Sequence, residues 1–336
     1  MNKTEQHILD ILEILQGQPE PTNSADIANM LNDEGNIISD RTVRHYLKQM
    51  DQDGLTINSG RRGRTITPAG RAIVENHVVL DKTGFLSARI DQMTYAMTFD
   101  LETQTGTVVV NTILVKQQDF ALCLDKVERV FKYGYAMGTL AALFAPGESC
   151  GQTIVPEEHV GLVTVCSVTL NGVLLKHGIP SHARFGGILE LIDGKPRGFS
   201  HIIQYDGTTV DPLEVFIRSG MTNYIGAITT GTGAIGASFR EIPADSRPRA
   251  LALSRKLDQA GLGGIYEIAR RSRPLRGIPV STGRSGMIVI GGLNPASIFE
   301  ESGIRIKAFA LSGIMPFERL RHYSLLRKSL AVITRQ

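Results

Sequence analysis

Apolar residues recur at helical spacing near the start of the chain, with polar residues between them. Residues 6–15 predict a first helix, which ends before Gly17. Ser24 is expected to cap a short second helix that runs to Leu31, and Gly35 then turns the chain. The pattern therefore predicts two short helices in the first 35 residues.

A third helix is predicted from Asp40 to Met50, with Ser39 as its N-cap. Its apolar positions fall on one face, which leaves a polar and basic face outside. Arginine makes bidentate contacts to base edges in the major groove of DNA, and threonine, histidine and lysine reach bases or phosphates. This face is typical of a DNA recognition helix. Its candidate contact residues are Ser39, Arg41, Thr42, Arg44, His45 and Lys48.

Residues 55–67 alternate polar and apolar positions on either side of a glycine- and arginine-containing turn, which predicts a β-hairpin. Such a turn can lie along phosphates or enter the minor groove, where guanidinium groups are favoured. Its candidate DNA contacts are Arg61, Arg62 and Arg64. Three helices followed by this hairpin predict a winged helix-turn-helix, after which Pro68 opens a linker helix. The alternative is a protein-interaction module whose charges form a solvated face.

Length and composition place this unit within a larger protein. The 336 residues exceed one ordinary domain, so a small domain over residues 1–78 and a large one over residues 79–336 are expected. The net charge is only +3, and positive charge is concentrated in the third helix and the hairpin. No secretory signal or membrane-spanning stretch is expected, so the protein is predicted to be cytoplasmic.

The three cysteines, Cys123, Cys150 and Cys166, lack the close spacing of zinc and redox motifs. They are expected to be buried thiols in a reducing compartment. A role in lining a ligand site or in redox sensing is the alternative. No metal site is predicted.

From residue 82 onward β-rich segments alternate with helices, which predicts an α+β domain. An amphipathic helix is expected at residues 120–135. The expected strands cover residues 85–90, 93–100, 106–115, 160–169 and 183–192.

The same order of motifs occurs twice in this large domain. A strand, a Leu-Asn pair, a helix, a Gly-Ile pair and a second strand follow one another in residues 161–189 and again in residues 286–315. The large domain is therefore predicted to be a duplicated unit, with halves at about residues 85–195 and 200–316. Ligand sites commonly lie in clefts between two such halves.

Candidate ligand-binding groups occur in the first half. His182 and Arg184 alternate on a predicted strand, so they are expected to share a face, and two cations beside glycines suit a dicarboxylate. The alternative is a solvated edge strand or an ion pair within the fold. Neutral donors at the end of the preceding strand are Ser167, Thr169 and Asn171.

A glycine-rich stretch in the second half, residues 231–236, matches the G-x-G-x-x-G pattern of dinucleotide-binding loops. Such a loop must open a helix, yet Pro243 interrupts the segment after the glycines, and the repeat aligns this stretch with the predicted strand at 108–115. The hydroxyl and backbone N–H groups here suit a small carboxylate or phosphate instead, with tight turns as the alternative. The candidate ligand residues are Thr229, Thr230 and Thr232.

No combination of residues typical of catalysis is present, such as a G-x-S-x-G elbow, a phosphate-loop lysine or H-E-x-x-H. A regulator is therefore favoured, and an enzyme that uses the glycine-rich stretch as a nucleotide site is the least favoured alternative. Basic residues at 270–273 and 319–328 are interpreted as solvated faces, or as a secondary contribution to DNA affinity through phosphates.

Joined to the predicted winged helix, the segments Val165–Gly172 and Gly178–Gly187 resemble those of the NrpR family of nitrogen-regulatory repressors. The resemblance covers nearly the whole chain and implies one regulatory domain after the DNA-binding domain. It implies a homodimer that binds an inverted-repeat operator in double-stranded DNA, uses no cofactor, and is released by the effector 2-oxoglutarate. A second NrpR-type chain is a further candidate partner, and the alternative is an interaction protein whose large domain pairs with a second regulator.

Overall fold

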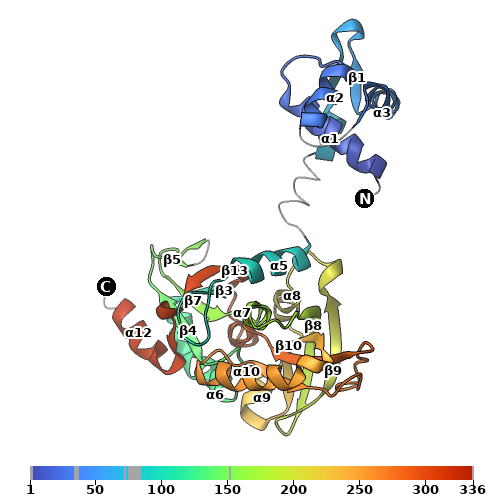
Figure 1. The fold of residues 1–336 in the computed structure, drawn as a ribbon. Coiled ribbons are helices and arrows are strands. Elements are labelled where there is room, and N and C mark those ends of the chain that lie inside the picture. The colour runs from blue at the N-terminus through green and yellow to red at the C-terminus, as the bar shows by residue number, and fades with distance from the viewer. Residues whose placement is uncertain (1–2, 34–37, 72, 75–84, 151–152, 335–336) are drawn as a thin grey trace. The chain divides into compact units, whose positions relative to one another are not determined.

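The computed structural model describes residues 3–33, 38–71, 73–74, 85–150 and 153–334. The chain forms two separate units, residues 1–84 and residues 85–336 (Figure 1). Each unit has its own hydrophobic core, and the predicted turn at Gly35 lies outside the described residues.

The first unit has the element order that the sequence predicts for a winged helix-turn-helix. Apolar residues of its helices and of its second strand pack into one core, because helical spacing puts them on facing sides. The chain is again helical at residues 68–71, as expected for the start of the linker helix. The elements are α1 (Lys3–Gly17), α2 (Ser24–Asp33), α3 (Asp40–Gln52), β1 (Thr56–Asn58), η1 (Gly60–Arg62) and β2 (Arg64–Ile66).

The capping residue differs from the prediction at one helix. Asn23 rather than Ser24 caps α2, since its Oδ1 accepts hydrogen bonds from the backbone N of Ala25 and of Asp26, both at 3.0 Å. Ser39 caps α3 as predicted. Asparagine and serine cap about equally well, so the backbone path, and not residue type, chooses between two adjacent candidates.

Two antiparallel five-stranded sheets form the centre of the second unit. In the first sheet the strand order is β13-β3-β7-β4-β14, and in the second it is β11-β12-β10-β8-β9. The strands of the first sheet are β3 (Thr107–Lys116), β4 (Leu140–Phe144), β7 (His159–Val165), β13 (Lys307–Pro316) and β14 (Arg321–His322). Those of the second sheet are β8 (His182–Ile192), β9 (Lys195–Gln204), β10 (Gly233–Pro243), β11 (Ile265–Ile268) and β12 (Arg284–Ile290).

Helices cover these sheets, with α5 on one side of the second unit and α6, α9 and α10 on the other (Figure 1). The helices are α5 (Leu86–Ala96), α6 (Gln117–Lys132), α7 (Val168–Lys176), α8 (Pro212–Arg218), α9 (Tyr224–Thr230), α10 (Arg247–Gln259), α11 (Ser297–Glu301) and α12 (Leu326–Ile333). Shorter elements are β5 (Ser149–Cys150), β6 (Thr153–Ile154), η2 (Tyr205–Gly207), η3 (Ala244–Ser246), η4 (Asn294–Ala296), η5 (Phe317–Arg319) and η6 (Tyr323–Leu325). The expected α+β class is confirmed.

The strands predicted at residues 85–90 and 93–100 are wrong, because most of this segment forms α5. The buried residues of α5, Leu86 and Ile90, are spaced by four, which is the periodicity of one helix face, whereas Tyr95 is 88% exposed. The strand predicted at 160–169 is too long, since β7 ends at Val165 and α7 follows. Residues 168–174 are all buried in α7, so their apolar run carries no period that distinguishes a helix from a strand.

The two halves of the second unit repeat one order of elements. β3 lies between β7 and β13, and β10 lies between β12 and β8. In each half the strand after the short helix joins the other half's sheet, so β8 pairs with β10 and β13 pairs with β3. This exchange of strands ties the halves together. It also makes residues 233–236 the start of a central strand, equivalent to β3, and not a nucleotide-binding loop.

Candidate functional site

The outer face of α3 carries exposed basic groups. Arg41, Arg44, His45 and Lys48 are exposed, whereas the apolar residues of the opposite face are buried against α1 and α2. The Nη2 of Arg44 lies 2.6 Å from the Oδ2 of Asp40; the side chain of Arg44 is largely exposed and that of Asp40 is partly exposed. An exposed pair of this kind contributes little to stability, so Arg44 can exchange its partner for a phosphate at small cost.

Ser39 and Thr42 have a structural role at the start of the same helix. The Oγ of Ser39 accepts a hydrogen bond from the backbone N of Thr42 at 3.2 Å and lies 2.8 Å from that residue's Oγ1. Backbone N–H groups at such a helix start are suited to a phosphate oxygen. These two predicted contact residues therefore position the helix start.

The hairpin presents its arginines in different ways. Arg62 is exposed, whereas Arg64 is mostly buried and donates from Nε to the Oδ2 of Asp51 at 2.9 Å. The other oxygen of Asp51 accepts a hydrogen bond from Thr56 Oγ1 at 2.6 Å, so this carboxylate ties α3 to both strands of the wing. The side chain of Arg61 lies outside the described residues. Arg64 thus supports the fold of the wing, and Arg62 is exposed on its surface.

In the second unit, two of the predicted ligand residues converge on an arginine that the sequence analysis missed. Arg240 on β10 is only 1% exposed, and its guanidinium donates to Ser167 O at 2.9 Å, to Ser167 Oγ at 2.8 Å and to Asn171 Oδ1. Its Nε donates to Ser238 Oγ at 3.3 Å. Burial lowers the pKa of Arg240, yet arginine remains charged in proteins. Ser167 and Asn171 therefore solvate a buried cation.

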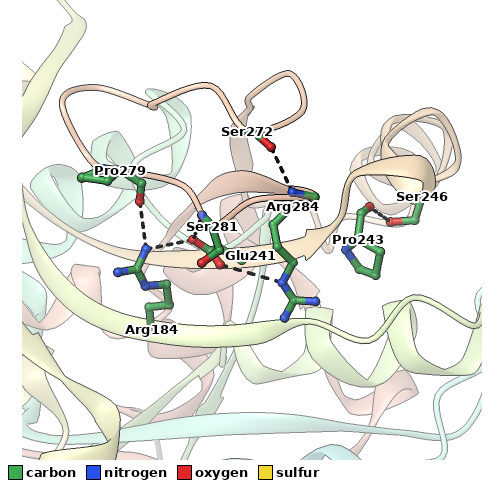
Figure 2. A network of polar contacts seen from close by, with 9 residues as sticks. Arg184, Glu241, Pro243, Ser246, Ser272, Pro279, Ser281 and Arg284 are labelled. Atoms are coloured by element: carbon green, nitrogen blue, oxygen red, sulfur yellow. Dashed lines mark hydrogen bonds and ion pairs between the residues drawn. The ribbon is translucent and has the colours of Figure 1, made fainter.

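Arg184 and Arg284 meet a buried carboxylate on the opposite side of β10. Glu241 is 2% exposed, and its Oε1 accepts hydrogen bonds from Arg184 Nη1 at 2.8 Å and from the backbone N of Ser281 at 3.1 Å (Figure 2). Its Oε2 lies 3.8 Å from Arg284 Nε. Burial alone would raise the pKa of Glu241, but the hydrogen bonds from Ser281 and the ion pair with Arg184 hold it below its usual range.

The strand register explains how Arg184 reaches this carboxylate. The pairing of β8 with β10 slips between Phe239 and Arg240, and Glu241 then lies opposite His182. His182 is exposed beside it. Because Arg184 and Arg284 together outnumber Glu241, this end of the second sheet keeps an excess of positive charge.

The remaining candidates do not join this group. Thr169 is fully buried, and its Oγ1 bridges the backbone N and O of Val109, both at 3.0 Å. The Oγ1 of Thr229 and of Thr230 bond to carbonyls of their own helix, and Thr232 donates its backbone N to Thr230. They lie beside the first residue of β10, whereas Glu241 lies eight residues along it, roughly 26 Å away. The predicted ligand residues therefore form separate sites.

A cavity of about 290 Å³ lies elsewhere in the second unit, between α5, α8 and β13. Asp211 and Glu214 are its acidic groups and Arg89 its basic one. Burial, followed by the charge of Glu214, raises the pKa of Asp211 to about 6. Burial also raises the pKa of Glu214, whose Oε1 accepts a hydrogen bond from the backbone N of Ala310 at 2.5 Å. This cavity favours neutral or cationic groups near α8.

Comparison of the two halves exposes the pattern that the sequence analysis missed. Through equivalent pairings with β7 and β12, Arg240 and Glu241 occupy the places that Ile113 and Leu114 occupy in β3. An Arg-Glu pair inside an apolar strand is expensive to bury unless both charges find partners. That pair was therefore a sign of a polar site in the sequence itself.

Other kinds of site find no support in the part of the chain that the structure describes. Among those residues, no group of three or more His, Cys, Asp or Glu side chains could hold a metal ion. No helix there has the length and apolar character needed to cross a membrane.

Both units match known protein families. Residues 9–74 match the ribonuclease R winged-helix domain, and residues 83–322 match NrpR regulatory domains NRD1 and 2. With the basic face of α3, these matches define a DNA-binding transcription regulator, as predicted, and not an enzyme. The chain belongs to the NrpR family of nitrogen regulators, and the predicted resemblance is confirmed.

Named relatives agree with this assignment. The global nitrogen regulator NrpRI of Methanosarcina mazei is 31% identical over 94% of this chain and 98% of its own length. The global nitrogen regulator NrpR of Methanococcus maripaludis is 30% identical over 88% of this chain, which spans 51% of that relative. The crystal structure of a nitrogen repressor-like protein from Methanococcus jannaschii covers 71% of this chain and 99% of its own, at 26% identity and a TM-score of 0.59.

Proposed function

We propose that this chain represses nitrogen-assimilation genes in the cytoplasm by binding an inverted-repeat operator in double-stranded DNA as a homodimer, and that 2-oxoglutarate releases it. The observation that carries the DNA-binding part is the face of α3, where Arg41, Arg44, His45 and Lys48 stand exposed over a buried apolar face. Arg62 of the wing supplies a further cation. A dimer of such units reads two half-sites about one helical turn apart, which suits an inverted repeat.

The proposed effector site lies at the end of the second sheet, around Glu241. Arg184 and Arg284 supply two guanidinium groups for the carboxylates of 2-oxoglutarate, and His182 lies alongside. One carboxylate of the protein already shares these cations, so an incoming dicarboxylate competes with Glu241 for them. That competition gives the ligand a way to move β8 relative to β12.

Release follows from linkage between the two ligands. If 2-oxoglutarate binds one arrangement of the dimer better than the arrangement that binds the operator, it lowers DNA affinity by the ratio of those two affinities. A tenfold release needs a difference of about 1.4 kcal/mol, which one charge-assisted hydrogen bond supplies.

The test is fluorescence anisotropy of an inverted-repeat promoter fragment with the full chain, with and without millimolar 2-oxoglutarate. Arg184→Ala and the milder Arg184→Lys are expected to bind the operator as the natural chain does but to lose most of the ligand response. Lys195→Ala removes an exposed cation from neighbouring β9 and serves as the matched control. An unchanged response in both Arg184 variants would disprove the effector site, and failure to prefer the inverted repeat would disprove the operator.

Variants of the first unit separate contact from support. Arg44→Gln and Arg62→Gln are each expected to weaken DNA binding. Each should also reduce the slope of log affinity against log salt concentration by about the contribution of one phosphate contact. Arg64→Gln is expected instead to lower the thermal stability of the first unit, because Asp51 loses its partner. If Arg62→Gln changed neither the affinity nor the salt dependence, the wing would not contact DNA.

A further inference from the structure

The connection between β11 and β12, residues 269–283, carries an unusual concentration of arginine. It contains Arg270, Arg271, Arg273 and Arg276, with no acidic residue. Over residues 240–284 there are ten basic residues against four acidic ones, although the whole chain has a net charge of only +3. Positive charge is therefore concentrated on this part of the second unit.

Backbone hydrogen bonds hold this connection in a defined conformation. Ser272 N donates to Arg284 O at 2.7 Å, and Gly283 N donates back to Ser272 Oγ at 3.0 Å. Ala244 N, just before α10, donates to Gly283 O at 3.0 Å. The connection thus lies against the start of α10, next to Arg184 and Arg284, the two arginines that contact Glu241 (Figure 2). Its arginines stand on an ordered surface.

Most of this charge is available to a partner. Arg271 pairs with Asp245 at 3.0 Å and Arg276 pairs with Glu267 at 2.8 Å, and both pairs are exposed enough to exchange partners at small cost. Three further arginines are exposed and form no ion pair with any residue in the described ranges: Arg249, Arg270 and Arg273.

The fold itself does not call for these arginines. Arg249 lies in the first turn of α10, where the helix dipole disfavours cations. The equivalent connection of the first half, residues 145–158, joins β4 to β7 and carries three glutamates and no lysine or arginine. Two connections in equivalent places of one repeated fold thus have opposite charge, so the positive one is better explained by an external partner.

We propose that Arg249, Arg270, Arg271 and Arg273, here called the arginine surface, bind the sugar-phosphate backbone of duplex DNA in addition to the winged helix. The proposal rests on the proposed function only in that the chain binds DNA. Guanidinium groups meet phosphates in a bidentate fashion, and the surface is made of arginine rather than lysine. Contacts to phosphate carry no sequence information, so the arginine surface adds affinity but not specificity.

The experiment measures the binding of the full chain to two duplexes, one with the inverted repeat and one of random sequence, between about 50 and 200 mM salt. The test variant is the triple change Arg249→Gln, Arg270→Gln and Arg273→Gln. The matched control changes three exposed cations outside the arginine surface and outside the basic segment 319–328, namely Lys132, Arg305 and Lys307, to glutamine. Equal thermal unfolding midpoints of the two variants establish that both are folded. If the triple variant does not fold, the single variants Arg270→Gln and Arg273→Gln are measured in its place.

The triple variant is expected to show a salt dependence shallower by roughly 2 to 3 in the log–log slope, since each phosphate contact contributes about 0.9. Its affinity for both duplexes should fall at least tenfold at the lower salt, with the ratio between the duplexes unchanged. A slope equal to that of the control would overturn the proposal and leave an acidic protein as the partner of this surface. If the natural chain binds both duplexes equally, that result counts against the proposed function alone, since binding to the random duplex still tests the arginine surface.

Discussion

Replacing Asp211 with asparagine is expected to stabilise the second unit. Asp211 caps α8, with its Oδ1 accepting hydrogen bonds from the backbone N of Leu213 at 2.8 Å and of Glu214 at 3.4 Å. Burial raises its pKa from 3.8 to about 6, so its charged form is unfavourable in the folded protein. Asparagine keeps the capping oxygen and removes the charge.

The magnitude and its pH dependence follow from this pKa. The native carboxyl group binds its proton more tightly than the unfolded chain does, so the penalty is absent below pH 3.8 and is fully present above about pH 6. The difference between those two pKa values corresponds to about 3 kcal/mol. Because Asp211 lines an open cavity, solvent screening reduces the expected gain in the free energy of unfolding to about 2 kcal/mol.

Urea unfolding followed by the near-ultraviolet circular dichroism of tyrosine measures this gain, since seven of the eight tyrosines lie in the second unit. The free energy of unfolding of Asp211→Asn should exceed that of the natural chain at pH 8 and equal it near pH 4. Asp206→Asn removes an exposed carboxylate nearby and should change neither value. A gain that is the same at both pH values, or no gain at pH 8, would refute the assignment of the cost to a buried charge.

Further expectations concern the winged helix and the Glu241 site. Gly63→Ala should destabilise the first unit by more than about 2 kcal/mol, because φ is 110° there and an added Cβ would lie 2.2 Å from the backbone C of Thr22. A thermal unfolding midpoint equal to that of the natural chain would contradict this. Asn23→Ala should cost about 1 kcal/mol by urea unfolding and Ser24→Ala almost nothing, and equal costs would mean that the cap is shared. Glu241→Gln should lower the thermal midpoint of the second unit, since Arg184 and Arg284 lose their buried counter-charge; an unchanged midpoint would show that solvent already screens both.

Patterns that are local in the sequence predicted the first unit well. The apolar spacing of α3 predicted Val43, Met50 and either Tyr46 or Leu47 as its buried face, and the structure buries Leu47. The basic residues between them then had to lie outside. The repeated motif likewise anticipated equivalent strands in the two halves. Local patterns failed where a segment is buried on every side, as in α7, because an apolar run then has no period.

The partners of the polar groups could not be predicted in this way. Asn171 was expected to contact a ligand, but it accepts a hydrogen bond from Arg240, 69 residues away. Arg184 donates a hydrogen bond to Glu241, which lies 57 residues further along the chain. The contact of Arg184 depends on the pairing of β8 with β10, which joins strands from the two halves of the second unit.

The order of residues was enough to establish the class of this protein: a winged helix with a basic face, joined to a duplicated α+β domain of the NrpR family. Helix and strand periods and repeated motifs are properties of neighbouring residues, so they can be recognised along the chain. Contacts between distant segments were needed to establish that Arg64 braces the wing, that Thr229 and Arg184 lie at opposite ends of a sheet, and that Arg240 is buried without a carboxylate partner among the described residues. The cost of burying a charge depends on the groups that surround it, and strand pairing between distant segments sets those surroundings.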